Sequence, residues 1–291
     1  MTRIDAGTRD FGEEMQNRTT STNKTTREKR VLAIAAHPDD IEFMMAGTLL
    51  ALRARGWEVH YFNVSDGCAG STVLTRAATA KTRLGEARDS CKKGGFTHHP
   101  PIANDLGVLY EEELIAKTIS VVRQVEPTII LTQSPQDYME DHQNATRLAV
   151  TAGFCRGMKN ALCFPKRPPY FDDVAVYHAM PYGLRDGMGK LLHSGLWVDV
   201  SKQIEQKRAL LACHTSQKQW LDATQGMDSY LQTMVDLCSA MGKMSKKYAL
   251  AEGWRKHNAL GFASDPAFDP LRTALSGLCT VDKKYAAWLD E

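Results

Sequence analysis

The feature that most constrains the fold of this chain is the run "RVLAIAA" (residues 30–36), which stops abruptly at charged side chains. Its apolar residues follow one another without alternating with polar ones, which is typical of a parallel strand buried on both faces. In the next stretch, 40–56, the apolar residues have helical spacing, and the stretch ends at Gly56, a residue that commonly ends helices. A buried strand followed by a helix is the start of a β-α-β unit.

Strands and helices continue to alternate along the first two thirds of the chain. Strands are predicted at 57–65, 128–135, 172–181 and 194–201, and helices at 75–95, 111–126, 144–158 and 201–214. This order implies right-handed crossovers between parallel strands. The predicted fold class is α/β, with a Rossmann-like, mostly parallel sheet flanked by helices and a helical C-terminal extension.

We expect three parts along the chain. Residues 1–29 are polar and rich in threonine, which predicts a flexible N-terminal arm. Residues 30–215 carry the alternating pattern and form the α/β domain. Residues 216–291 look mainly helical and are predicted to pack on that domain as an extension.

Composition excludes several classes of protein. The formal net charge of +2 over 291 residues gives no support for nucleic-acid binding. The chain has no run of about 18 apolar residues, so a membrane span is not expected, and the N-terminus lacks the apolar stretch of a secretory signal. Seven scattered cysteines without a Cys-x-x-Cys pair indicate reduced thiols and a cytoplasmic protein.

Two clusters of polar residues follow predicted strands. His37, Asp39 and Asp40 end the first strand, and "QSPQDYMEDH" (133–142) ends a later one. Ligands collect beyond the carboxyl ends of parallel strands, so the two loops can meet. His37, Asp40 and His142 would then form the two-histidine, one-carboxylate set of a catalytic metal site. Asp39 would be free to act as the general base.

Simpler interpretations exist for the same residues. An Asp-Asp pair at a helix start ordinarily caps the helix and pairs with its dipole, and an isolated His142 is more often a surface or satisfied histidine. The placement of both clusters at strand ends favours the metal site. A nucleotide-binding Rossmann domain is disfavoured, because no Gly-x-Gly-x-x-Gly follows the first strand.

Five motifs together resemble the PIG-L/LmbE-like family of zinc-dependent deacetylases, which remove acetyl groups from N-acetylglucosamine-type substrates. They cover roughly residues 30–217 in the order of the family, and they are "AAHPDDIEF", "SDGCAGS", "TRLGEARDS", "SPQDYMEDH" and "ACHTSQ". The resemblance implies that His37, Asp40 and His142 bind the metal, taken as Zn²⁺ with another divalent metal as the alternative. It implies that Asp39 is the catalytic base.

Other positions match with less defined roles. By the resemblance, Arg83 and Glu86 occupy the Arg-x-x-Glu helix, where Arg83 could meet a polar part of the substrate and a helix-face ion pair is the alternative. Asp141 could orient an imidazole as a carboxylate behind the ligands. Asp105 could accept hydrogen bonds from sugar hydroxyls, or it could simply stabilise a turn.

The chain departs from the common form of the family at one position. Where many members have His-Pro-Asp-His, residues 139–142 are Met-Glu-Asp-His, so the histidine that helps to stabilise the tetrahedral intermediate is Met139 here. Methionine can neither donate a proton nor stabilise an oxyanion. We expect His178, after a later strand, to be the catalytic substitute, with Tyr138 and Tyr182 as weaker ones. Tyr138 is also a candidate for substrate binding.

The predicted function is a zinc-dependent N-deacetylase, which removes an acetyl or other acyl group from an N-acylated amino sugar or its conjugate. The alternatives are a metal- or carbohydrate-binding protein with reduced or no activity, and a hydrolase of a different amide or ester. The retained Asp39 favours an enzyme, since a site that only binds metal needs no base beside the ligands. The expected partner is a small amino-sugar substrate, with a homo-oligomer possible and no nucleic acid.

Overall fold

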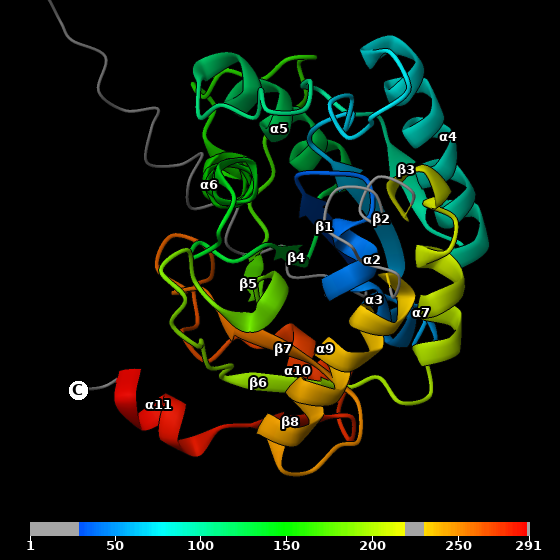
Figure 1. The fold of residues 1–291 in the computed structure, drawn as a ribbon. Coiled ribbons are helices and arrows are strands. Elements are labelled where there is room, and N and C mark those ends of the chain that lie inside the picture. Colours follow the sequence, from blue (N-terminus) through cyan, green and yellow to red (C-terminus); the bar gives the residue numbers. More distant parts are fainter. Residues whose placement is uncertain (1–28, 219–229, 290–291) are drawn as a thin grey trace, which may run out of the picture.

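The computed structural model describes residues 29–218 and 230–289, so the predicted N-terminal arm lies almost wholly outside the described residues. Within them, an eight-stranded sheet runs in the order β3-β2-β1-β4-β5-β7-β6-β8 (Figure 1). The strands are β1 (Arg30–Ala35), β2 (Glu58–Asn63), β3 (Thr97–His99), β4 (Ile129–Thr132), β5 (Ala175–Ala179), β6 (Leu196–Asp199), β7 (Ala251–Lys256) and β8 (Cys279–Val281).

The sheet has a parallel and an antiparallel part. Strands β2, β1, β4 and β5 pair in parallel, as the strand–helix alternation predicted, and β3 adds a further parallel pair with β2. Beyond β5 the pairs β5–β7, β7–β6 and β6–β8 are antiparallel. The α/β fold class with a mostly parallel, helix-flanked sheet and C-terminal helices is confirmed.

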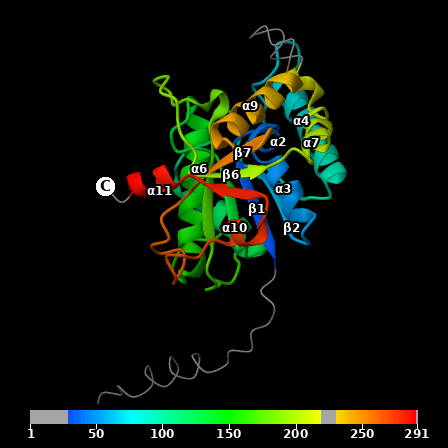
Figure 2. The same ribbon diagram turned by 90° about the horizontal axis from the view of Figure 1, so that it is seen from below.

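Helices cover both faces of the sheet (Figure 2). The first strand shows why, because it is buried on both faces. Val31, Ala33 and Ala35 join an apolar cluster with α2, α3, α4, α7 and α9, whereas Leu32 and Ile34 join a second cluster with α5 and α6. The helices are α2 (Asp40–Met44), α3 (Ala46–Arg53), α4 (Arg76–Gly94), α5 (Glu112–Val125), α6 (Glu140–Phe154), α7 (Ile204–Leu211), α9 (Tyr230–Ser245), α10 (Pro270–Ala274) and α11 (Lys283–Leu289).

The structure differs from the sequence prediction in three places, the first of which is β3, where no strand was expected. The helix expected over 40–56 is two helices, α2 and α3, because the backbone of Met45 leaves the helical region at φ −132°. The part expected to be a mainly helical extension contributes β7, which lies between β5 and β6 in the sheet, and β8 at its edge. Strand β7 was missed because a single mixed stretch, "AEGWRK", carries no clear period-2 pattern.

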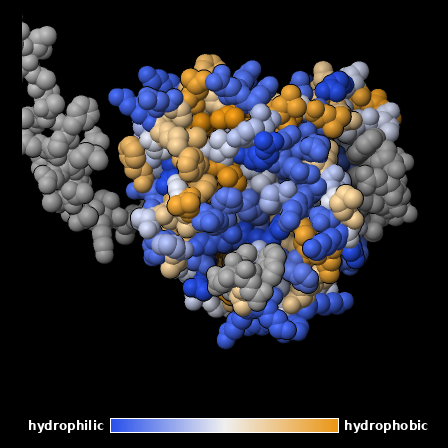
Figure 3. All heavy atoms as spheres, turned by 90° about the vertical axis from the view of Figure 1, so that its left-hand side faces the viewer, coloured by the Kyte–Doolittle hydropathy of each residue, from blue (hydrophilic) through white to orange (hydrophobic). Residues whose placement is uncertain are grey.

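On the side of the molecule at the left of Figure 1, apolar and polar residues are interspersed over the surface (Figure 3). Such mixing is the ordinary surface of a folded domain. No helix in the described part of the chain is both long and apolar enough to cross a membrane.

Candidate metal centre

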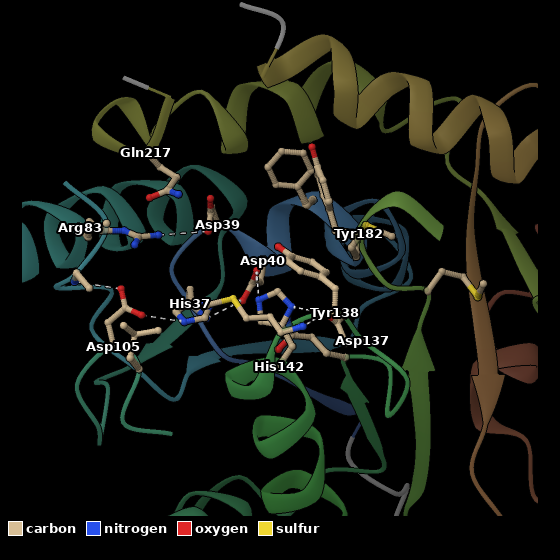
Figure 4. A pocket seen from close by; sticks show the side chains of 18 residues that line it. His37, Asp39, Asp40, Arg83, Asp105, Asp137, Tyr138, His142, Tyr182 and Gln217 are labelled. Carbon is tan, nitrogen blue, oxygen red and sulfur yellow. Dashed lines mark hydrogen bonds and ion pairs between the residues drawn. The ribbon is translucent and has the colours of Figure 1, made fainter. Parts of the chain in front are cut away.

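The loops after β1 and β4 meet at the carboxyl ends of these neighbouring parallel strands, as the sequence predicted (Figure 4). His37 lies two residues beyond β1, and Asp40 begins α2. His142 lies in the first turn of α6, after the loop that follows β4. Three predicted ligands from two distant segments therefore reach one point.

The ligand atoms of these three residues are close enough to bind one ion. Nδ1 of His37 lies 3.4 Å from Oδ2 of Asp40, and Nε2 of His142 lies 3.4 Å from Oδ1 of the same carboxylate. All three ligand atoms lie within 4.8 Å of one another. Asp40 also accepts a hydrogen bond from the backbone N–H of His37 at 2.7 Å, which fixes its side chain.

The other ring nitrogen of each histidine also contacts at least one carboxylate. Nε2 of His37 lies 3.2 Å from Oδ1 of Asp105 and 3.2 Å from Oδ2 of Asp141. Nδ1 of His142 lies 3.0 Å from Oδ1 of Asp137. Such carboxylate–histidine pairs set the tautomer and the ring orientation of metal ligands. The second acidic cluster, His37 with Asp105 and Asp141, is explained as this support.

The surroundings of the two rings favour positive charge. Burial lowers the pKa of His37, but Asp105, Asp141 and Asp40 raise it well above its ordinary value. Burial also lowers the pKa of His142, and Asp40 with Asp137 raises it above the ordinary value. Burial would raise the pKa of Asp40, but the two histidines hold it well below its usual range.

The residues present therefore fit a divalent metal ion. Two imidazoles and one carboxylate are a common donor set of catalytic zinc sites, and several other divalent metals accept it. His37 and His142 are buried and Asp40 is half-buried. Because the pKa values of both histidines are raised, binding of a cation would release protons from them. The arrangement of the three residues leaves the side facing the cavity open.

Asp39 lies beside the predicted ligands and is bound by other groups. Its backbone has φ 111°, an unusual conformation for a residue other than glycine and one that clusters at functional sites. Oδ1 accepts a hydrogen bond from Arg83 at 3.3 Å, and Oδ2 accepts one from Tyr230 at 2.7 Å. Burial raises the pKa of Asp39 to about 6, against the opposing effect of Arg83.

Arg83 is held rigidly behind Asp39. Its guanidinium donates to the carbonyl oxygens of Pro38 at 2.6 Å and Gly67 at 3.1 Å. Gly67 has φ 66°, and a Cβ there would collide with the guanidinium. The first glycine of the "SDGCAGS" motif is therefore required both for the turn and for the position of the Arg83 guanidinium.

Glu86, the second residue of the Arg-x-x-Glu helix, does not reach the cavity. Its carboxylate accepts hydrogen bonds from the backbone N–H and the hydroxyl of Ser216, at 2.8 and 2.6 Å. It therefore ties α4 to the "CHTSQ" segment. The alternative of a helix-face ion pair for Arg83 and Glu86 finds no support, since each binds a different segment.

The structure does not bring His178 to the centre. Its Nδ1 lies 3.0 Å from the carbonyl oxygen of Gln133, and its Nε2 lies 3.0 Å from Nδ1 of His257. Both ring nitrogens are thus engaged within the sheet, and His178 is not among the residues that line the cavity. The predicted catalytic role of His178 gains no support from this position.

A cavity of about 540 Å³ opens over the three candidate ligands. Tyr138 and Tyr182, the weaker predicted substitutes, both line it, as does Met139. The pKa of the Tyr138 hydroxyl is raised by burial and by Asp40, so the phenol stays protonated and can donate a hydrogen bond. Asp105 and Arg83 line the other end of the same cavity.

Sequence reasoning missed three supporting residues. Asp137 and Tyr230 bind His142 and Asp39 directly. Glu42 is buried, and its Oε1 lies 3.1 Å from Nε2 of His214, whose charge lowers the pKa of Asp39. A signal existed for Asp137, because it stands five residues before His142 and metal-binding histidines usually carry a second carboxylate. No local signal marked Tyr230, which comes from a helix near the other end of the chain.

Comparison with known proteins finds relatives among the deacetylases. The family model of GlcNAc-PI de-N-acetylase (PIG-L) matches residues 32–153. The curated diacetylchitobiose deacetylase of Thermococcus kodakarensis is 28% identical over 231 residues, which cover 78% of this chain and 82% of that protein. These matches confirm the resemblance seen in the motifs: residues 32–153 match the PIG-L family model, and the chain is similar to the PIG-L/LmbE-like deacetylases.

Solved structures share the fold. The N,N'-diacetylchitobiose deacetylase of Pyrococcus horikoshii has a TM-score of 0.69 and 21% identity, covering 93% of this chain and all of that one. The 4-carboxy-2-hydroxymuconate hydratase of Pseudomonas putida has a TM-score of 0.64 and 19% identity, covering 78% of this chain and 95% of that one. A deacetylase and a hydratase on one fold show that the reaction must be argued from the site.

Proposed function

We propose that this protein is a zinc-dependent N-deacetylase, which hydrolyses the amide of an N-acylated amino sugar or its conjugate. The observation that carries the proposal is Asp39: a buried carboxylate that adjoins the candidate metal ligands, is positioned by Arg83 and Tyr230, and has a pKa of about 6. A carboxylate with this pKa is mostly ionised at neutral pH and is well suited to take a proton from water.

In the proposed hydrolysis, each bond that forms is matched by a bond that breaks. Water adds its oxygen to the acyl carbon, the C–N bond breaks, and the products are a carboxylic acid and a free amine. Held by His37, Asp40 and His142, a divalent metal would polarise the carbonyl and lower the pKa of a water molecule. Asp39 accepts the proton of the attacking water and returns it to the leaving nitrogen.

The oxyanion partner is supplied from the cavity wall in this proposal. Met139 cannot donate a hydrogen bond, and His178 is engaged elsewhere. The Tyr138 ring packs edge-on against His142, with ring centroids 5.6 Å apart, which places its phenol beside the ligands. Tyr138 is therefore our first candidate for the donor, ahead of Tyr182, whose ring lies 6.3 Å from that of Tyr138.

Sugar hydroxyls would be bound at the opposite end. Arg83, Asp105 and Gln217 line that end of the cavity (Figure 4). Gln217 is 9% exposed, and its side-chain oxygen has no hydrogen-bond partner in the part of the chain that the structure describes. A buried acceptor without a partner costs roughly 1–3 kcal/mol, which a substrate hydroxyl would offset.

The test measures amine and acetate released from N-acetylglucosamine, N,N'-diacetylchitobiose and related conjugates. The protein is assayed after chelation and again after Zn²⁺, Mn²⁺ or Co²⁺ is restored, with Asp39→Asn as the control. Metal-dependent release by the wild type alone supports the proposal. Stoichiometric metal binding without release from any member of the panel would overturn it and favour a metal-binding protein.

A further inference from the structure

The two ends of the cavity differ sharply in chemistry. The candidate metal ligands lie in the middle, with Gln217, Arg83 and Asp105 on one side and the labelled tyrosines on the other (Figure 4). Six aromatic and thioether side chains line the cavity and form what we call the apolar wall: Phe43, Met44, Tyr138, Met139, Met180 and Tyr182. Apart from two phenol hydroxyls, these side chains offer no strong hydrogen-bonding groups.

The apolar wall is continuous from the core to the rim. Phe43 packs edge-on against Tyr182, with ring centroids 5.6 Å apart. Tyr182 in turn lies 6.3 Å from Tyr138. Met180 and Phe43 are 1% and 6% exposed, whereas Tyr138 is 58% exposed. The wall therefore presents an apolar path between Tyr138, which contacts His142, and the buried Phe43.

This path starts at the reacting centre. Tyr138 contacts the ring of His142, and Met139 immediately precedes α6, which carries that ligand. In an amide bound with its carbonyl at the ligands, the acyl carbon has the nitrogen and its sugar on one side and the acyl chain on the other. Hydroxyls belong with Arg83, Asp105 and Gln217, so the acyl chain points along the apolar wall.

We propose that the substrate of this site carries a linear aliphatic N-acyl group longer than acetyl, bound along the wall from Phe43 to Tyr138. This inference rests on the proposed amide hydrolysis. The reaction balances as before: water adds to the acyl carbon, the C–N bond breaks, and a medium-chain fatty acid and a free amino sugar leave. An acetyl group would fill only the part of the wall next to the ligands.

The experiment compares N-acetyl-, N-propionyl-, N-butyryl- and N-hexanoyl-glucosamine with the metal-loaded protein. We expect kcat/KM to rise about fourfold per added methylene, or about 250-fold over the four methylenes from acetyl to hexanoyl, as each methylene leaves water. The hexyl and methyl glycosides of N-acetylglucosamine serve as controls for an apolar group on the other side of the sugar. These two glycosides should be hydrolysed at similar rates.

Variants then locate the effect on the wall. Met44→Gln places an amide in the apolar half, whereas Met44→Leu preserves its character. We expect the ratio of kcat/KM for hexanoyl over acetyl to fall about tenfold in Met44→Gln and to be retained in Met44→Leu. Leu260→Gln, at a residue 83% exposed that does not line the cavity, is the matched control and should keep the wild-type ratio.

The outcomes separate the two proposals. Hydrolysis of N-acetylglucosamine with a falling rate for longer chains would overturn the acyl assignment and leave the deacetylase intact. A rate that rises with the glycoside chain instead of the acyl chain would also overturn it. No hydrolysis of any acyl derivative by metal-loaded protein would overturn the hydrolase proposal itself, and this inference with it.

Discussion

In the described residues, three pairs of histidines have the same separation of ring centroids, 5.2 Å, but different chemistry. They are His37 with His142 at the strand ends, His60 with His99 across β2 and β3, and His178 with His257 at β5 and the residue after β7. The first pair forms the candidate metal centre. The other two pairs lie within the sheet.

The difference lies in the carboxylates and in the space between the rings. His37 and His142 share Asp40 between them and are not hydrogen-bonded to each other. The rings of His60 and His99 bond directly at 2.9 Å, as those of His178 and His257 do at 3.0 Å, which leaves no place for an ion. Residue type and spacing alone therefore do not define a metal site; buried anions and an open point between the ligand atoms do.

The pKa values follow the same division. Carboxylates hold the pKa of His37 and His142 above the ordinary value despite burial. Burial lowers the pKa of His99 to about 4 and that of His178 to about 4. Burial also lowers the pKa of His60, despite the exposed Glu58 beside it. The paired histidines of the sheet are thus neutral structural groups, whereas the carboxylates around His37 and His142 favour positive charge at the strand ends.

The largest expected effect is on catalysis by the base. Asp39→Asn should lower kcat by roughly 10²–10⁴ and leave metal affinity within a few-fold, since Asp39 takes a proton but is not among the three ligands. Steady-state amine release and metal titration of the same preparation measure both quantities. Wild-type turnover in this variant would remove Asp39 from the mechanism.

Removal of a ligand should weaken metal binding more than removal of any supporting group. In His142→Ala we expect metal affinity to fall by more than the 10–100-fold typical of partners outside the coordination sphere. Competition with a chelator of known affinity gives the value. His99→Ala is the matched control, and equal metal content in the two variants would show that His142 is not a ligand.

Loss of the negative charge on Asp137, which contacts His142, should have an intermediate effect on metal affinity. Asp137→Asn still accepts a hydrogen bond from His142 but loses the negative charge, so metal affinity should fall about 10–100-fold with the fold intact. The same chelator competition measures it, with the circular dichroism spectrum as a check on folding. Unchanged affinity would mean that Asp137 only shapes the loop before α6.

Acid should weaken the sheet pairs through their lowered pKa values. Between pH 6.5 and 4 the unfolded chain protonates His99 whereas the folded chain does not, so this contribution to stability is complete above pH 6.5 and is lost as the pH falls towards 4. His99→Gln, which is neutral throughout, should reduce the loss of unfolding free energy between pH 6.5 and 5 by roughly 1–2 kcal/mol. Urea unfolding at several pH values tests this, and parallel curves for both proteins would contradict it.

The smallest effect is expected at His178. Since its ring bonds to Gln133 and His257 away from the cavity, His178→Gln should change kcat by less than about twofold, against the 10²–10⁴ of a general acid or base. Tyr138→Phe under the same assay provides the contrast, because it removes the proposed oxyanion donor. A large loss in His178→Gln with normal stability would restore the catalytic role predicted from sequence.

Much of the centre could be read from local patterns. The apolar run before His37 and the one before the 133–142 loop predicted neighbouring parallel strands, and their carboxyl ends then brought His37, Asp40 and His142 together. The roles of residues further from the strand ends were harder to predict. Asp137 is near His142 in sequence but lies in a loop without a regular pattern, and His178 lies within β5, where its ring contacts Gln133 and His257.

The sequence by itself determined the α/β alternation, the parallel strands and the residue types at their ends, because strand burial and crossover handedness depend on short-range patterns. Only the tertiary structure decided which polar groups contact the candidate ligands and Asp39. Tyr230 reaches Asp39 from a position 191 residues away, and β7 enters the sheet between two earlier strands. Such contacts depend on how distant segments pack, and no pattern within either segment encodes them.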